Sequence, residues 1–471
     1  MSHQDQGRKN NSRTHAAQLL LAFVWLFGGV SLNVITLRQD CTWTAQTLMY
    51  AAILWAWSDE KTLGDRFAVT RKIIMFWFSG QPQPAESYQA FVKLLRKWTD
   101  PLIERLKAVF RRRMKELLAD VWLVAGFAVF ACDGSRVDVP RTRRNEERYS
   151  SKSKLSRAAQ KRRRQAKRRR TQRLARASKA KVPHIWLTVM WHVGSGLPWD
   201  WRAGPADSSE RGHLEEMLAA LPPGSLITAD AGFVGYDLWQ RILSSGHHLL
   251  VRVGGNVKLL KKLGYAQEKE GMVYLWPDRA AQKRLPPLVL RLAVVSGKGH
   301  PIYLVTSIMA SSQLSEKQMA EVYRHRWGIE VFYRHCKQTF ERRKLRSQNP
   351  DNAMVELQWS LAGMWAMGLH SHVRLVRRGV PPGKISFAGV LRAYRRCMRE
   401  YKSPPDTGER LEKMLDRAII DSYTRKNKNS RDYPRKQEEK AAGPPIFLNA
   451  TRVQQRLAQE VKIERQKGLS A

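Results

Sequence analysis

Two short apolar segments, each followed directly by an aspartate, constrain the fold of this chain more than any other feature of its sequence. Val129–Cys132 is followed by Asp133, and Leu226–Ala229 is followed by Asp230. Apolar runs of this length, bounded by turn residues, are typical of strands buried in a sheet. Candidate strands and helices alternate around them, which is the pattern of a mixed sheet covered by helices. We therefore predict an α/β fold in which both aspartates lie where a buried strand leaves the sheet.

The remaining elements follow from the same periodicity. Further strands of this sheet are predicted at His184–Trp191, Leu197–Trp201 and His248–Val253, with helices at His213–Leu221 and Gly235–Ser244. A strand-rich stretch then covers residues 256–312, with strands at Val273–Trp276, Leu288–Val295 and Ile302–Thr306. After it the pattern is helical: one long helix runs from near Ser315 to about Phe340, and others cover roughly 352–377 and 386–401.

This pattern divides the chain into four parts. They are an N-terminal all-helical domain (1–120), an α/β domain in two pieces (121–255 and 313–378), a β-rich insertion (256–312) and a C-terminal helical region with a basic tail (379–471). The N-terminal part is a candidate for binding DNA ends. Residues 422–471 are polar, basic and contain proline, so we expect them to be mobile.

The charge of the chain points to its partners. Lys and Arg number 83 against 41 Asp and Glu, giving a formal charge of +42 over 471 residues. Such an excess favours a polyphosphate partner, and an anionic membrane is the second choice. Residues 151–182 hold fifteen Lys or Arg and no acid. This run is either a solvated loop or a contact with the DNA backbone that does not depend on base sequence.

Two stretches near the N-terminus raise the question of a membrane. Leu19–Val30 and Cys41–Ser58 carry no formal charge, and each is interrupted by polar or glycine residues. A buried helical hairpin in a soluble domain explains both, so a membrane partner is not expected. The cysteines, Cys41, Cys132, Cys336 and Cys397, are too far apart in sequence for a zinc knuckle or a CxxC site. A reducing, cytoplasmic location fits this cysteine usage best.

A third acid, Glu330, lies on the predicted helix that starts near Ser315. At about 100° per residue, Tyr323, Arg326, Glu330 and Lys337 share one stripe about 60° wide. Apolar side chains occupy an adjacent face: Val322, Ile329, Phe332, Cys336 and Phe340. The apolar face can pack on the sheet while the polar stripe meets a ligand. The alternative is a solvated helix with ion pairs such as Arg326–Glu330.

Two aspartates at one sheet edge and a glutamate on a nearby helix make an oxygen-rich site suited to hard cations. Mg²⁺ is often held by one or two carboxylates together with substrate phosphate. Two such ions about 3.5–4 Å apart can activate an attacking oxygen and stabilise a leaving one.

The spacing Tyr323-x2-Arg326-x3-Glu330-x6-Lys337 resembles the Tyr-Arg-Glu-Lys signature of DDE transposases of the insertion-sequence-four type. Asp133-Gly134-Ser135 resembles the first-aspartate motif of that family, and Asp230-Ala231-Gly232-Phe233 resembles its second. The order of the acids and the room for a β insertion also agree. The resemblance covers about residues 125–375. One departure is Ala231, since relatives often carry a basic residue after the second aspartate.

The resemblance implies a ribonuclease-H-like catalytic domain over 121–255 and 313–378. In it, Asp133, Asp230 and Glu330 would be catalytic and would bind two Mg²⁺ ions, with Mn²⁺ as an alternative. Water would cut the element ends, and the freed 3′-hydroxyl would attack, in relatives by way of a hairpin, and then join target DNA.

The resemblance also implies the DNA contacts. Tyr323, Arg326 and Lys337 would hold terminal phosphates, and Trp276 in the insertion would stack on a flipped base unless it is an ordinary sheet residue. The partners would be double-stranded DNA and, once two ends are paired, a second copy of the chain, with no small-molecule substrate. Other functions remain open: a metal-dependent nuclease, a transposase-derived DNA-binding protein without catalysis, and a membrane-associated polybasic protein.

Overall fold

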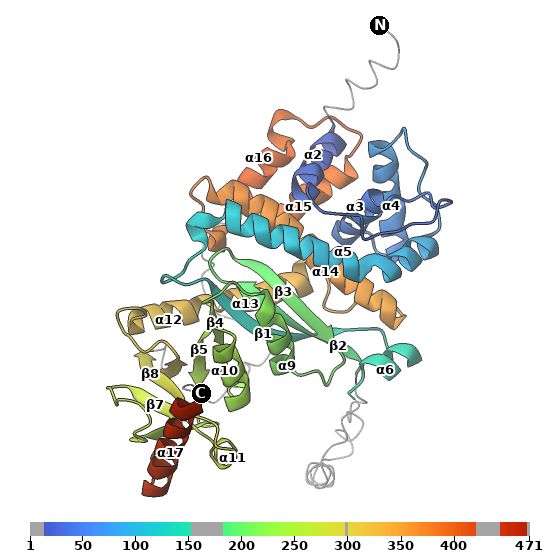
Figure 1. Cartoon of the computed structure of the whole chain (residues 1–471). Helices are drawn as coiled ribbons and strands as arrows, with labels where there is room; N and C mark the ends of the chain where they lie inside the picture. The colour runs from blue at the N-terminus through green and yellow to red at the C-terminus, as the bar shows by residue number, and fades with distance from the viewer. Residues whose placement is uncertain (1–13, 152–181, 297–299, 421–442, 469–471) are drawn as a thin grey trace, which may run out of the picture.

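The computed structural model describes residues 14–151, 182–296, 300–420 and 443–468 (Figure 1). Nearly all of the basic run 151–182 lies outside these described residues. The same holds for residues 421–442 of the predicted tail.

The N-terminal region is helical, as predicted. Its helices are α2 (His15–Phe27), α3 (Ala45–Trp57), α4 (Leu63–Trp77) and α5 (Tyr88–Leu117), followed by the short 3₁₀ turn η1 (Ala119–Val121). Every residue of α3 from Thr47 to Trp57 is buried. The charge-free sequence of α3 therefore reflects a helix surrounded by protein. No helix in the described part of the chain combines the length and apolarity needed to cross a membrane.

C-terminal helices complete this helical layer. They are α14 (Pro350–Val376), η5 (Pro382–Lys384), α15 (Phe387–Arg399), η6 (Thr407–Glu409) and α16 (Leu411–Asp416). The long helix α14 packs against α3 and α5, and α15 packs against α2 (Figure 1). The first and last helices of the chain thus share one hydrophobic core.

The sheet has ten strands in the order β10-β6-β7-β8-β9-β5-β4-β1-β2-β3. The half that the sequence predicts to be catalytic consists of β1 (Val129–Asp138), β2 (His184–His192), β3 (Leu197–Gly204), β4 (Leu226–Ala229) and β5 (His248–Val253). β1, β2 and β3 are antiparallel, whereas β4 runs parallel to β1 and β5 parallel to β4. This mixed order is that of a ribonuclease-H-like sheet, so the predicted fold class is confirmed. The helical elements beside this half are α6 (Arg143–Tyr149), α9 (Glu210–Met217), η2 (Leu218–Ala220), η3 (Ala231–Phe233) and α10 (Tyr236–Ser244).

The β-rich stretch continues the same sheet. It contains β6 (Lys258–Lys261), β7 (Met272–Leu275), α11 (Asp278–Gln282), β8 (Leu288–Ser296) and β9 (Pro301–Thr306). β9 pairs antiparallel with β5, from Leu250 opposite Thr306 to Val253 opposite Tyr303. The insertion is therefore hydrogen-bonded to the catalytic half through a continuous ladder.

The prediction of a mobile tail is wrong for residues 443–468. They form β10 (Ile446–Asn449), which pairs parallel with β6, and α17 (Arg452–Gly468). Ala458 and Val461 of α17 are buried, and Arg284 from the end of the insertion forms ion pairs with Glu460 and Glu464 of α17. The segment is polar because α17 is amphipathic: only one face, which includes the buried Ala458 and Val461, packs against the protein.

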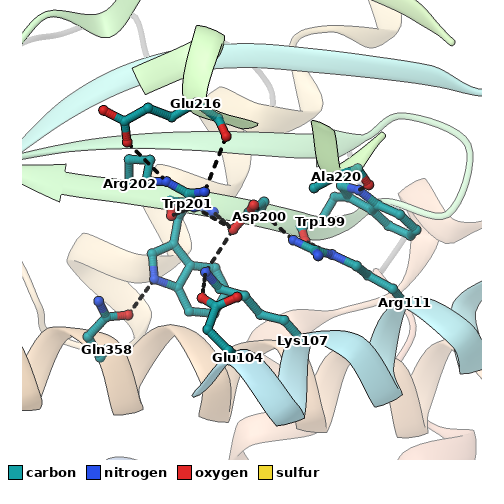
Figure 2. Close-up of polar contacts among 10 residues, drawn as sticks. All are labelled: Glu104, Lys107, Arg111, Trp199, Asp200, Trp201, Arg202, Glu216, Ala220 and Gln358. Carbon is teal, nitrogen blue, oxygen red and sulfur yellow. Dashed lines mark hydrogen bonds and ion pairs between the residues drawn. The ribbon is translucent and has the colours of Figure 1, made fainter. Parts of the chain in front are cut away.

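A buried carboxylate joins the helical layer to the sheet. Asp200 of β3 forms ion pairs with Lys107 and Arg111 of α5, at 2.7 Å and 2.9 Å, and with its neighbour Arg202 at 3.0 Å (Figure 2). Burial alone would raise the pKa of Asp200, but the three cations outweigh it and lower that pKa. This centre fixes α5 across β3.

Candidate active site

Asp133 and Asp230 lie on adjacent parallel strands. β1 pairs with β4 from Val129 opposite Leu226 to Ala131 opposite Thr228. Continuing this register by two residues places Asp133 beside Asp230. The prediction that β1 ends at Asp133 is wrong, because β1 continues to Asp138 along its other neighbour, β2. Asp133 is nevertheless at an edge, since β4 ends at Ala229 and leaves that side of β1 unpaired.

A fourth acid, Glu210, lies against the first aspartate motif. Glu210 is the first residue of α9, which follows the N-cap Ser209. A Cβ built on Gly134 would lie 2.4 Å from Glu210 Oε1 and 2.6 Å from its Cδ. The glycine after Asp133 thus leaves the space that the Glu210 carboxylate fills. Sequence reasoning missed Glu210, since nothing in its local sequence distinguishes it from an ordinary acid in a first helical turn.

Burial and neighbouring carboxylates raise the pKa values of Asp133 and Glu210. The pKa of Asp133 rises to about 7, chiefly by burial, with the charges of Asp230 and Glu210 adding to the rise. The N–H of Gly134, which donates to Asp133 Oδ1 at 2.8 Å, and the charge of Arg326 act in the opposite direction. The pKa of Glu210 is also raised, by burial and by Asp230. Concentrated negative charge of this kind is relieved by a bound cation.

The predicted helix carrying Glu330 is broken into three parts: α12 (Glu316–His325), α13 (Gly328–Arg334) and the π-helical turn η4 (His335–Thr339). Gly328 begins the second part, and a Cβ there would lie 3.1 Å from the indole nitrogen of Trp191, so glycine suits this position. The predicted buried face holds through the break: Val322, Ile329, Phe332, Cys336 and Phe340 are all buried.

Glu330 is paired with Arg326, its neighbour one turn earlier, at 2.9 Å. The Arg326–Glu330 ion pair of the alternative interpretation therefore exists. Arg326 is largely buried, lies over the ring of Tyr323 with 5.3 Å between guanidinium carbon and ring centroid, and also interacts with the charge of Asp133. Since the Arg326 Nε has no hydrogen-bond partner among the described residues, the guanidinium retains a free donor beside the acids.

Tyr333 fixes α13 against the sheet. Its hydroxyl donates to the carbonyl oxygen of Asp133 at 2.7 Å and accepts from the N–H of Val189, the residue opposite Asp133 on β2, at 3.1 Å. Because Tyr333 follows Glu330 by three residues, this contact holds the turn that carries Glu330 next to Asp133. Sequence reasoning also missed Tyr333.

Lys337 reaches the first aspartate motif as well. Its Nζ donates to Ser135 Oγ at 2.6 Å, and burial lowers its pKa. Of the predicted stripe, Lys337 thus contacts the first aspartate motif and Arg326 interacts with the charge of Asp133, while Glu330 and Tyr323 are in contact with Arg326. Arg211 of α9 donates to the carbonyl of Gly232 at 2.9 Å. A basic side chain therefore lies at the turn after Asp230, although Ala231 itself is neutral.

The donor set fits a hard cation, but its ligands are not gathered around one point. Asp133, Asp230, Glu210 and Glu330 offer only carboxylate oxygens, which Mg²⁺ and Mn²⁺ prefer. Across the described ranges, no three His, Cys, Asp or Glu side chains are arranged to hold a metal ion. Glu330 is paired instead with the guanidinium of Arg326.

A family model described as "Transposase DDE domain" matches residues 126–365, just over half of the 471-residue chain. The chain belongs to this family of DDE transposases. The matched range includes all three acids of the predicted triad, and the family as a whole uses divalent metal ions.

Two individual DDE transposases are similar to this one. Transposase InsG for insertion sequence element IS4 of Escherichia coli K12 is 27% identical over 197 residues, which are 39% of this chain and 44% of InsG. The match thus spans less than half the length of that relative. The piggyBac transposase, solved by cryo-EM as a synaptic complex with hairpin DNA, aligns over 88% of this chain and 87% of its own, with 12% identity and a TM-score of 0.42.

Two tryptophans of this chain lie in contrasting settings. Trp276 is 3% exposed, and its indole N–H donates to the carbonyl of Leu285 at 2.8 Å. Trp276 therefore has the environment of an ordinary buried sheet residue, which was the alternative to a role in base stacking. Trp327, which sequence reasoning passed over, is 58% exposed between Arg326 and Gly328. No sequence signal pointed to it, since the helix break at which it lies was not predicted.

Proposed function

We propose that this chain is the transposase of an insertion sequence, which cuts the ends of its element and joins them to target DNA. The observation that carries the proposal is the meeting of Asp133 and Asp230 at one sheet edge, faced by the Arg326–Glu330 pair. Asp133, Asp230 and Glu330 are the proposed ligands of two Mg²⁺ ions, for which Mn²⁺ can substitute. When bound, such ions activate the attacking oxygen and stabilise the leaving one.

The residues around the acids are suited to handling DNA phosphate. Arg326 exchanges Glu330 for a phosphate oxygen as the DNA end arrives, which frees the Glu330 carboxylate to act as a ligand. Lys337 supplies a second cation, and Tyr323 a hydroxyl donor, to the terminal phosphates. The exposed ring of Trp327, rather than the buried Trp276, is placed to stack on an unpaired base.

The proposed partners are double-stranded DNA, as element ends and as target, and a second copy of this chain. Cutting and joining two ends together requires two active sites held in register, so we expect a homodimer on paired ends. Light scattering of the end-bound complex measures this. A complex of one protein and one end that completes both reactions would contradict it.

The decisive experiment is a cleavage and strand-transfer assay on DNA that carries the inverted repeats flanking the reading frame. Asp133→Asn, Asp230→Asn and Glu330→Gln should each abolish Mg²⁺-dependent cleavage and leave DNA binding largely intact. Because these residues act as a unit, the double variants should be no less active than the single ones. Lys337→Ala should instead weaken assembly on the end.

Other outcomes separate the alternative functions. Cleavage without joining would identify a metal-dependent nuclease on the same fold. End binding without cleavage by the unmodified chain, in either Mg²⁺ or Mn²⁺, would identify a DNA-binding protein that has lost catalysis.

A further inference from the structure

Three arginines from distant parts of the chain meet at the C-terminal end of α3, away from the acids. Arg66 belongs to α4, Arg342 follows η4, and Arg395 belongs to α15. Each donates to a backbone carbonyl there: Arg66 Nε to Glu60 at 2.8 Å, Arg342 Nη2 to Ala56 at 3.0 Å and Arg395 Nε to Trp57 at 2.8 Å. The carbonyls at the end of a helix attract cations, but the helix end amounts to only about half a negative charge. Three full positive charges therefore exceed what α3 can balance.

No carboxylate in the described part of the chain forms an ion pair with any of the three. The nearby acids are engaged elsewhere: Glu341 pairs with Arg346 at 3.7 Å and Asp59 with Arg399 at 2.8 Å. Glu356 is buried close by, and its charge opposes the lowering of the pKa of Arg66 and of Arg342, although its oxygens accept hydrogen bonds from the N–H groups of residues 346 and 347 and from the Ser347 hydroxyl. One buried carboxylate thus faces three guanidinium groups, and an excess of positive charge is costly to bury because desolvation disfavours it.

Donors at this point also lack acceptors. Arg66 is 1% exposed and Arg342 is 1% exposed. The Nη2 atoms of Arg66 and Arg395 are buried and have no hydrogen-bond partner among the described residues, and the same is true of the hydroxyl of Thr70. Thr70 lies one turn after Arg66, on the same face of α4. Burial, together with repulsion from Arg342, lowers the pKa of Arg66 to about 9.

We propose that Arg66, Arg342 and Arg395 form a site for one phosphate group, with Thr70 as an additional donor. Guanidinium groups suit this ligand, since their planar N–H pairs match two oxygens of a phosphate. The half-buried Arg395 is the side from which the anion enters. The ligand is either a phosphodiester of bound DNA or free inorganic phosphate, which offer the same oxygens.

The site lies at a junction of the molecule. The N–H of Arg342 donates to the carbonyl of Cys336 at 3.0 Å, and its Nη1 donates to that of Phe340 at 2.6 Å. Arg342 is thus fastened to the turn that carries Lys337, while Arg66 and α3 belong to the N-terminal helices. A phosphate held by all three arginines would join the N-terminal helices to that turn. The inference is independent of the proposed metal chemistry.

The test uses the full-length protein and thermal unfolding in inorganic phosphate against chloride at equal ionic strength. For a single site, phosphate at one hundred times its dissociation constant should raise the Tm by about 3 °C in a protein of this size. Arg395→Met should lose this rise. Arg392→Met, which changes an exposed arginine of the same helix, should retain it.

A second measurement distinguishes the two sources of phosphate. If a DNA phosphodiester occupies the site, Arg395→Met should lower the slope of log affinity against log salt by about 0.9 for duplex DNA. Loss of the phosphate effect with an unchanged slope identifies free phosphate as the ligand. If Arg395→Met does not fold, Arg395→Lys replaces it. The proposal is overturned if phosphate does not raise the Tm of the wild-type protein above its value in chloride and the salt slopes of the wild type and the Arg395 variant are equal. It is also overturned if the variants at Arg395 and Arg392 show the same Tm rise and the same salt slope.

Discussion

Gly134→Ala should change the candidate active site without unfolding the protein. The added methyl group would lie 2.4 Å from Glu210 Oε1, 2.6 Å from Cδ and 2.8 Å from Cγ. Ordinary contact requires about 3.5 Å, so the carboxylate must move by about 1 Å. It can do so because Glu210 is a half-buried side chain at the start of α9, and no backbone atom is in the way.

The two effects on stability are small and of opposite sign. An altered Glu210 rotamer costs about 0.5–1.5 kcal/mol, whereas replacing a strand glycine by alanine contributes about 0.5–1 kcal/mol. Stability should therefore stay within about 1 kcal/mol of wild type in urea unfolding. Mn²⁺ affinity, measured by titration calorimetry, should fall about 10- to 100-fold, as is typical when a residue supporting metal ligands is displaced.

A double-mutant cycle tests this reasoning. Glu210→Ala alone should weaken Mn²⁺ binding, and Gly134→Ala should add little to it, because the side chain it displaces is already gone. Glu215→Ala, which removes a charge from the same helix where Glu215 pairs with Arg241, serves as the control. Equal losses from Gly134→Ala with and without Glu210 would refute the proposed link between the glycine and the carboxylate.

Three further results are expected. Asp200→Asn should cost up to about 3–5 kcal/mol in urea unfolding, because buried Lys107 would keep only the exposed Glu104 as an ion-pair partner, whereas Glu216→Gln should change little. Because the folded pKa of Asp200 is lowered, the stability from this centre is present above the unfolded pKa of about 3.9 and should be lost as the pH falls below it. Trp276→Ala should lower the free energy of unfolding by about 3–5 kcal/mol, because it removes a buried side chain. Trp327→Ala should leave that free energy unchanged and weaken binding to DNA ends by about 1–3 kcal/mol, measured by fluorescence anisotropy. The reverse pattern would identify Trp276 as the stacking residue. Removing residues 443–468 should expose the edge of β6 and produce aggregates in light scattering, and a monodisperse truncated protein would show that β10 is dispensable for solubility.

The sequence predicted the catalytic half of the sheet closely because its strands are short, apolar and bounded by turn residues. It failed at Asp133, where the Asp-Gly pair is typical of a turn. In the structure, β1 continues past that pair because β2 runs alongside it for nine residue pairs, whereas β4 stops. How long a strand runs thus depends on its neighbours, which a single strand's sequence does not specify.

The polar stripe was predicted on a helix assumed to be continuous. The break before Gly328 and the π-helical turn at Lys337 both depart from 100° per residue. The stripe still faces one place because Tyr333 and Lys337 are each bonded to the Asp133–Ser135 segment. Such contacts join residues about 200 positions apart in the chain, so no local pattern could reveal them, and the same applies to Glu210 beside Gly134.

The pairing of β10 with β6 has a consequence for how this protein is made. β6 ends at Lys261 and its partner strand begins at Ile446, so the ribosome must add the residues between them before the ladder can form. At about 5–20 residues per second, this takes about 10–40 s. During most of that interval one edge of β6 is open, because the strands on its other side, β7, β8 and β9, are synthesised long before β10. Each newly made chain therefore passes through a period in which β6 can pair with the wrong strand, and the synthesis of β10 ends that period.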